Sequence, residues 1–93
     1  MASHIKEESV PAALFALLRC PETHQTLAIA SRKLIDSLEA ARLAGALCDQ
    51  SGNRVEYAIE VGLVRRDEKR FYPIREGLPV LLIGESIALP LQA

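Results

Sequence analysis

The chain has 93 residues, of which 49% are hydrophobic and 25% charged, a size and composition that match one small folded domain. Eleven Lys and Arg against twelve Asp and Glu give a net charge of -1, which excludes a dominant electrostatic attraction to nucleic acid or to an anionic membrane. Two cysteines are too few for a disulfide scaffold, and no apolar run approaches the roughly 20 residues of a membrane-spanning helix. Because the first residues also include acids where a secretory leader is apolar, we expect a cytoplasmic protein without a membrane partner.

The first third of the chain predicts a flexible start, one helix and one short strand. Residues 1–8 are polar and are expected to be flexible, so that the single domain spans 9–91. Ser9 can cap a first helix, which Pro21 would end. The next β-compatible run covers residues 26–30.

A second helix is predicted over residues 32–44. Ser31 is a suitable N-terminal cap, and Gly45 is a suitable residue just after the last turn, so the segment occupies about 31–46 with its ends. Helical spacing places four apolar residues on one stripe, with Arg32, Asp36 and Glu39 opposite; the stripe contains Leu34, Ile35, Leu38 and Ala41. This pattern is typical of a helix that covers a core.

The second half of the chain predicts strands. Residues 59–63 alternate between apolar and other side chains, a polar turn follows, and residues 70–74 return as the second strand of a hairpin. The four apolar residues at 80–83 are typical of a strand that is covered on both faces. We therefore expect an α+β fold in which two helices pack on a small sheet of three to four mostly antiparallel strands.

Candidate chemistry begins with the cysteines. Cys20 and His24 would lie just after the first helix, where the helix dipole disfavours a thiolate, so we expect no catalytic residue and no enzyme activity. Cys48 is interpreted as a buried or half-buried small apolar residue. Five cations gather around the predicted hairpin turn, and nearby acids favour a solvated turn over direct nucleic-acid contact; these cations are Arg65, Arg66, Lys69, Arg70 and Arg75.

Three fragments of the chain resemble one known family when they are taken together. They read LLRCP at 17–21, GLV at 62–64 and FYPIREGLPVLL at 71–82. In this order they are similar to the Trm-one-twelve-like family of small zinc-ribbon-type proteins that activate methyltransferases, which includes short YcaR-like bacterial proteins. The resemblance covers about 13–30 and 60–89, and it implies that the helix predicted between these regions is an insertion.

The resemblance also implies two short zinc-binding turns, but most of their ligands are replaced in this chain. The first turn keeps Cys20 and has Thr23 at its second ligand position, while the two positions of the second turn fall on Arg66 and Lys69. Zinc needs four soft or imidazole ligands, and cations at two positions would repel it, so we expect no metal and no cofactor. One alternative stays open, because Cys20, His24 and Cys48 would supply three ligands if the fold brought them together.

The apolar run near the end of the chain is longer than a domain of this size easily buries. The resemblance implies that this region and a sheet edge lie against a methyltransferase; the expected partner-binding residues are Val80, Leu81, Leu82, Ile83, Ile87 and Leu89. The expected function is that of a non-catalytic small subunit that binds and stabilises or activates an S-adenosylmethionine-dependent methyltransferase. Two alternatives remain: the predicted helix 32–44 covers the strand, or the strand closes a symmetric dimer of a stand-alone structural protein.

Overall fold

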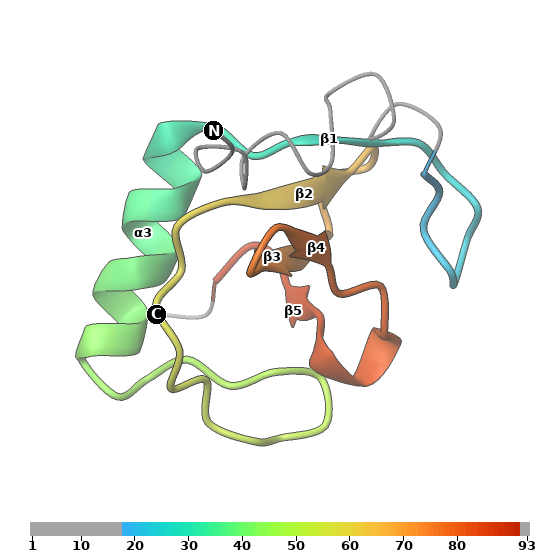
Figure 1. Ribbon diagram of the computed structural model, residues 1–93. Helices are drawn as coiled ribbons and strands as arrows, with labels where there is room; N and C mark the ends of the chain where they lie inside the picture. The colour runs from blue at the N-terminus through green and yellow to red at the C-terminus, as the bar shows by residue number, and fades with distance from the viewer. Residues whose placement is uncertain (1–17, 92–93) are drawn as a thin grey trace.

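The computed structural model describes residues 18–91 (Figure 1). The flexible start predicted for 1–8 and most of the first predicted helix lie outside these residues. The described elements are β1 (Leu27–Ile29), α3 (Arg32–Leu43), β2 (Gly62–Arg65), β3 (Arg70–Arg75), β4 (Leu78–Pro79), the 3-10 turn η1 (Ile83–Glu85) and β5 (Ile87–Ala88). Within residues 18–91, no helix is long and apolar enough to cross a membrane.

The strands form one antiparallel sheet in the order β1-β2-β3-β4. Strand β3 has β2 on one side, while its other side is shared by β5 near its start and β4 near its end. The predicted α+β class with an antiparallel sheet is therefore confirmed. The predicted count of two helices is not, since the described residues contain the single α-helix α3.

Helix α3 agrees closely with the sequence pattern. The hydroxyl oxygen of Ser31 accepts a hydrogen bond from the amide of Leu34 at 3.1 Å, which satisfies a donor at the start of the helix. Gly45 follows the last turn with a φ of 74°, a left-handed conformation that suits glycine. Glu39 differs from its predicted place on the solvated face, because it is half-buried and accepts a hydrogen bond from the amide of Ile59 at 2.8 Å.

The predicted hairpin is present, but its first strand starts at Gly62 and not at residue 59. Ile59 is 3% exposed and packs against the helix, so it belongs to the core without belonging to a strand. A side chain at position 62 would overlap the ring of Phe71 on the neighbouring strand. Gly62 is therefore the residue that lets the aromatic ring cross β2.

The predicted strand over 80–83 is wrong. Strand β4 ends at Pro79, and the chain then leaves the sheet and enters η1. Val80 donates to the carbonyl of Pro73 at 2.8 Å, but Pro73 has no N–H to return the bond, so the antiparallel ladder stops there. The departure leaves the first residues of β3 free to pair with β5.

The two faces of the sheet carry separate cores. On one side, α3 and the segment that follows it cover a larger cluster; its buried members are Ile35, Leu38, Leu47, Val55, Ile59, Phe71 and Ile87. The other side carries a smaller cluster of Cys20, Leu27, Leu63 and Tyr72, against which Leu81 packs. Because Leu81 lies with the second cluster, the alternative in which the helix covers the strand at 80–83 is also wrong.

Candidate functional site

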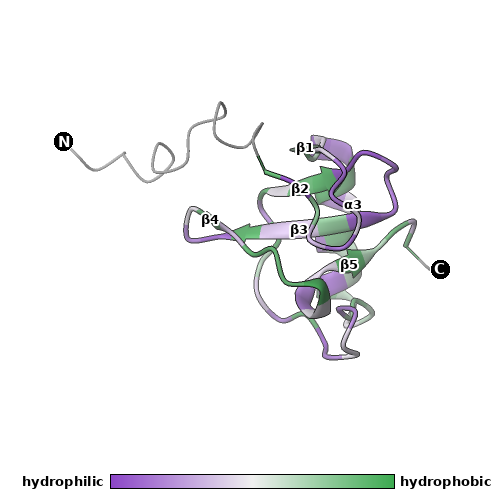
Figure 2. Cartoon of the chain, turned by 90° about the vertical axis from the view of Figure 1, so that its right-hand side faces the viewer, coloured by the Kyte–Doolittle hydropathy of each residue, from purple (hydrophilic) through white to green (hydrophobic). Residues whose placement is uncertain are grey.

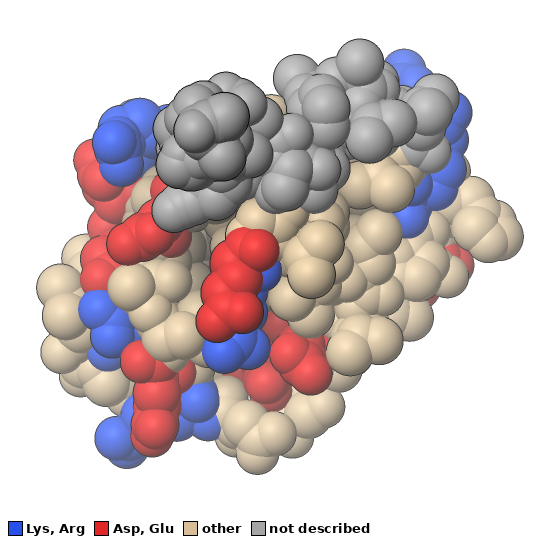
Figure 3. Space-filling view, viewed as in Figure 1, with Lys and Arg blue, Asp and Glu red and all other residues tan. Residues whose placement is uncertain are grey.

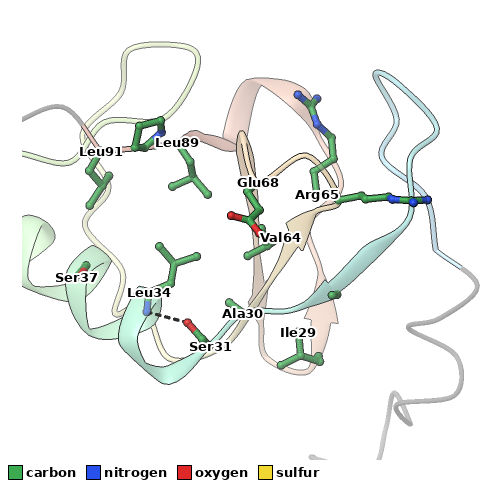
Figure 4. Close-up of a pocket in the computed structure, with 13 residues that line it drawn as sticks. Ile29, Ala30, Ser31, Leu34, Ser37, Val64, Arg65, Glu68, Leu89 and Leu91 are labelled. Carbon is green, nitrogen blue, oxygen red and sulfur yellow. Dashed lines mark hydrogen bonds between the residues drawn. The ribbon is translucent and has the colours of Figure 1, made fainter.

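The described residues hold their densest set of polar interactions where the turn before β1 meets the turn between β2 and β3. Arg65, at the end of β2, pairs with Leu27 of β1 and extends toward the segment 20–25 (Figure 4). The two turns are tied at the backbone as well, since the amide of Arg66 donates to the carbonyl of Thr26 at 3.0 Å. Segments about forty residues apart in the sequence therefore form one site.

The guanidinium of Arg65 has a partner in each turn. Its Nε and Nη2 atoms donate to the two carboxylate oxygens of Asp67 at 2.8 and 2.9 Å. Its Nη1 atom donates to Glu22 at 2.9 Å and lies 3.6 Å from the sulfur of Cys20. The Arg65 side chain is 8% exposed, whereas the side chains of Asp67 and Glu22 are 29% and 42% exposed, so a buried guanidinium meets carboxylates that are partly open to water. We call Cys20, Glu22, Arg65, Asp67 and Tyr72 the Arg65 cluster.

Glu22 also offsets the repulsion between two neighbouring arginines, Arg65 and Arg70. Arg70 begins β3 directly after the hairpin turn, and because Val64 pairs with Phe71, the next residue, Arg65, stands opposite Arg70. Cations on facing strand positions repel each other. One oxygen of Glu22 lies 2.9 Å from Arg65 and 3.3 Å from Arg70, so a single carboxylate bridges both.

The sulfur of Cys20 is fully buried and surrounded by donors. It lies 3.0 Å from the hydroxyl of Tyr72 and 3.3 Å from the amide of Glu22. Burial by itself raises the pKa of this thiol, but hydrogen bonds from Tyr72, Arg65 and Thr23 outweigh that effect and lower the pKa to about 6. The same surroundings raise the pKa of Tyr72, through burial first and then through its bond to Cys20.

The carboxylate of Asp67 responds to Arg65 in the same manner. The Arg65 hydrogen bonds lower the pKa of Asp67 to about 2, and in return they raise the pKa of Arg65. Gln25 adds a further connection between the turns, because its side-chain oxygen accepts from the amide of Asp67 at 3.1 Å and its nitrogen donates to the carboxylate at 3.3 Å. The cluster is thus a charged and hydrogen-bonded connection between two turns.

The zinc positions that the resemblance implies do not provide a set of metal ligands. Cys20 is buried, whereas Thr23, Arg66 and Lys69 are exposed. In the part of the chain that the structure describes, no three His, Cys, Asp or Glu side chains could hold a metal ion together. The open alternative of a site made by Cys20 with His24 and Cys48 is therefore wrong. His24 and Cys48 are exposed, so the expected burial of Cys48 is wrong as well.

The sequence predicted that the basic residues around the hairpin turn are solvated, but several of them make contacts within the protein. Arg65 belongs to the buried cluster, and Arg70 also donates to the side chains of Gln50 and Ser86, each at 2.9 Å. The guanidinium of Arg75 lies over the ring of Tyr57, 4.0 Å from its centre. These intramolecular contacts explain why three of the five clustered cations do not form a free cationic surface.

The six residues expected to bind a partner occupy three different environments. Leu82 and Ile83 are 57% and 37% exposed, while Val80 is half-buried. Leu81 packs in the second core, and Ile87, at 1% exposed, lies in the first, so its side chain is a core element and not a surface contact. Leu89 is half-buried beside the first core.

A further exposed apolar residue, which the sequence analysis did not select, lies four residues before Leu82 in the chain. Leu78, in the short strand β4, is 62% exposed. We call Leu78, Leu82 and Ile83 the apolar surface. Figure 2 shows the hydrophobic run that leads from β4 to η1. In Figure 3, which has the view of Figure 1, the right-hand side of the molecule carries a broad area without charged side chains. Its position directly after the Glu76–Gly77 turn was the signal that could have identified Leu78, since turn tips are seldom covered.

A separate groove of about 590 Å³ lies between β1, the start of α3 and the last described residues. Leu34, Val64, Leu89 and Leu91 point into it, while Arg65 points away (Figure 4). Leu89 therefore borders a different surface from Leu82. The predicted partner surface does not form one continuous patch.

Comparisons with known proteins were made on the sequence and on the fold. No protein-family model and no curated protein matches the chain. A solution NMR structure of the protein XF2673 from Xylella fastidiosa is similar, with a TM-score of 0.68 and 32% sequence identity, and the match covers 82% of this chain and 78% of that one. The chain therefore belongs to the same family as XF2673 of Xylella fastidiosa.

Proposed function

We propose that this protein is a non-catalytic subunit that binds and stabilises an S-adenosylmethionine-dependent methyltransferase through the apolar surface. The observation that carries the proposal is the exposure of Leu78, Leu82 and Ile83, three large apolar side chains within six residues. Such a surface favours contact with another protein, because apolar area removed from water contributes about 25 cal/mol per Å². The class of partner comes from the sequence resemblance to the Trm-one-twelve-like family.

The geometry around Leu82 suits a docking surface. Leu81 is held in the second core and the neighbouring Leu82 is exposed, so the segment is anchored while it presents a side chain to solvent. Ile83 begins η1, whose last amide bonds back to the carbonyl of Leu82 at 3.0 Å. A surface held in this way loses little conformational entropy on binding.

In this proposal the partner supplies the catalytic groups. Cys20 is fully buried in the Arg65 cluster, where a substrate does not reach its sulfur. Cys20 and Cys48 are both free thiols, which fits a reducing cytoplasm. The subunit then acts by covering apolar area of the enzyme, and a bound subunit stabilises its partner by mass action.

The test compares two lysine substitutions at exposed leucines. Leu82→Lys alters the apolar surface, and Leu43→Lys alters α3 at a residue that is 72% exposed, so both variants should keep the wild-type melting temperature. Tagged protein is purified from its native host, and the copurified material is tested for transfer of labelled methyl groups from S-adenosylmethionine. We expect methyl transfer with wild type and Leu43→Lys, and a loss of at least tenfold with Leu82→Lys.

Two results would contradict the proposal. One is equal methyl transfer with all three proteins, which would remove Leu82 from the interface. The other is a doubled molecular mass of the purified wild type, in light scattering, that Leu82→Lys returns to that of a monomer. That result would assign the apolar surface to a symmetric dimer.

A further inference from the structure

The metal that the family resemblance implies does not fit the residues that this chain places between its two turns. Of the four ligand positions, three are exposed and carry a hydroxyl or a cation. The fourth, Cys20, already has a guanidinium nitrogen 3.6 Å from its sulfur. The guanidinium of Arg65 keeps its positive charge, because its hydrogen bonds raise its pKa. A divalent cation bound to the Cys20 sulfur would therefore be repelled by a fixed positive charge.

The guanidinium itself makes the connections that a bound cation would make. Its partners in the first turn are Cys20 and Glu22, and its partner in the second is Asp67. The planar group directs several N–H donors in fixed directions, and here three of its nitrogens are used. Arg65 comes one residue before Arg66, which stands at one of the implied zinc-ligand positions. Arg65, the last residue of β2, is buried, whereas Arg66 is exposed.

We infer that the Arg65 guanidinium serves as an internal organic cation that links the two turns in place of a metal ion. The link is independent of the proposed partner. It makes the fold of the turns insensitive to metal supply and to chelators, and it assigns Glu22 and Asp67 the role of anionic ligands to the guanidinium. Arg66, although it stands at an implied ligand position, has no such role.

The experiment uses chemical replacement of the lost group in the full-length chain. Arg65→Ala removes the guanidinium, and Arg66→Ala is the matched control at the exposed neighbouring arginine. We expect the melting temperature of Arg65→Ala to fall by about 5–15 °C, because the change removes a buried side chain and leaves the buried Cys20 sulfur and two partly exposed carboxylates without their donor, and that of Arg66→Ala to stay near wild type. Amide hydrogen exchange in residues 20–25 should rise in Arg65→Ala alone.

Ethylguanidinium at about 10 mM, far below denaturing concentrations of guanidinium salts, should then restore much of the melting temperature of Arg65→Ala. The same concentration of tetramethylammonium, which has the charge without the N–H donors, should not. If Arg65→Ala does not fold, the melting temperature of Arg65→Lys, whose ammonium keeps the charge but loses the planar fork, is compared with that of Arg66→Lys, and only the first should fall below wild type.

The inference is overturned by any of three results. Wild-type protein could bind one equivalent of zinc or lose stability in a chelator. Arg65→Ala could melt at the temperature of Arg66→Ala. Ethylguanidinium could fail to restore Arg65→Ala, or could stabilise the wild type by as much, which would show that the added molecule acts elsewhere. Recovery specific to Arg65→Ala, with no response of wild type to zinc or chelator, supports it.

Discussion

The face of the sheet under α3 and the opposite face reach a folded state through different interactions. Seven buried apolar residues make up the helix-covered cluster, and they come from the helix, the segment after it and two strands. The opposite cluster has four buried members, among them Cys20 and Tyr72, and beside them lies the Arg65 cluster. Where a small domain has too little apolar area for two full cores, charged hydrogen bonds complete the second.

The comparison also shows where each kind of interaction is placed. Both faces join distant segments, since the helix-covered cluster runs from Ile35 to Ile87 and Arg65 and Glu22 are 43 residues apart, but the first is apolar and the second is charged. On the helix side, removal of volume should be the most damaging change. On the opposite face of the sheet, removal of a single polar atom should lower the free energy of unfolding.

The largest effect is expected in the helix-covered core. Leu38 is fully buried, so Leu38→Ala should lower the free energy of unfolding by about 2–5 kcal/mol through lost burial and a cavity. Urea unfolding followed by circular dichroism measures the change. Leu43→Ala, at an exposed position of the same helix, should stay within about 0.5 kcal/mol of wild type. Equal losses at both positions would contradict the assignment of the core.

A smaller effect is expected on the opposite face. Tyr72→Phe keeps the ring and removes the hydroxyl that lies 3.0 Å from the sulfur of Cys20. A buried polar group that loses its partner costs about 1–3 kcal/mol, and urea unfolding should show a loss in this range. Tyr57→Phe keeps its ring beneath Arg75 and is the control. A Tyr72→Phe variant as stable as wild type would show that the second face depends on packing alone.

The smallest effect concerns the ion pair of Glu39 with Arg42 in α3 and appears in acid. Hydrogen bonds from Arg42 and then from the amide of Ile59 lower the pKa of Glu39 from 4.5 to about 2. A lowered pKa in the folded state means that the carboxylate stabilises the fold above about pH 4.5, and that this contribution disappears as the pH falls to about 2.

Melting temperatures measured between pH 5 and 2 test this expectation. The wild type should lose more stability over that range than Glu39→Gln, which lacks the ionisable group. Glu60→Gln, at an exposed position outside the strands and α3, should follow the wild-type profile. Parallel profiles for wild type and Glu39→Gln would show that the helix side contains no stabilising carboxylate.

Local signals along the chain accounted for most of the secondary structure. The cap at Ser31, the glycine at 45 and the apolar stripe act within a few residues, and α3 ends within one residue of its predicted limit. The prediction of a strand at 80–83 was wrong because the apolar run does not decide where the strand ends. What decided was Pro73 on the neighbouring strand, whose missing N–H ends the ladder.

Composition and periodicity alone determined the α+β class, the helix and the hairpin, because each depends on contacts between residues close in the sequence. Only the tertiary structure decided which of five clustered cations is buried. The antiparallel pairing of β1 with β2 brings Glu22 and Cys20 to Arg65, while Arg66, the next residue, points to solvent. In a strand, neighbouring side chains face opposite ways, and which way is inward depends on a partner strand far away in the sequence.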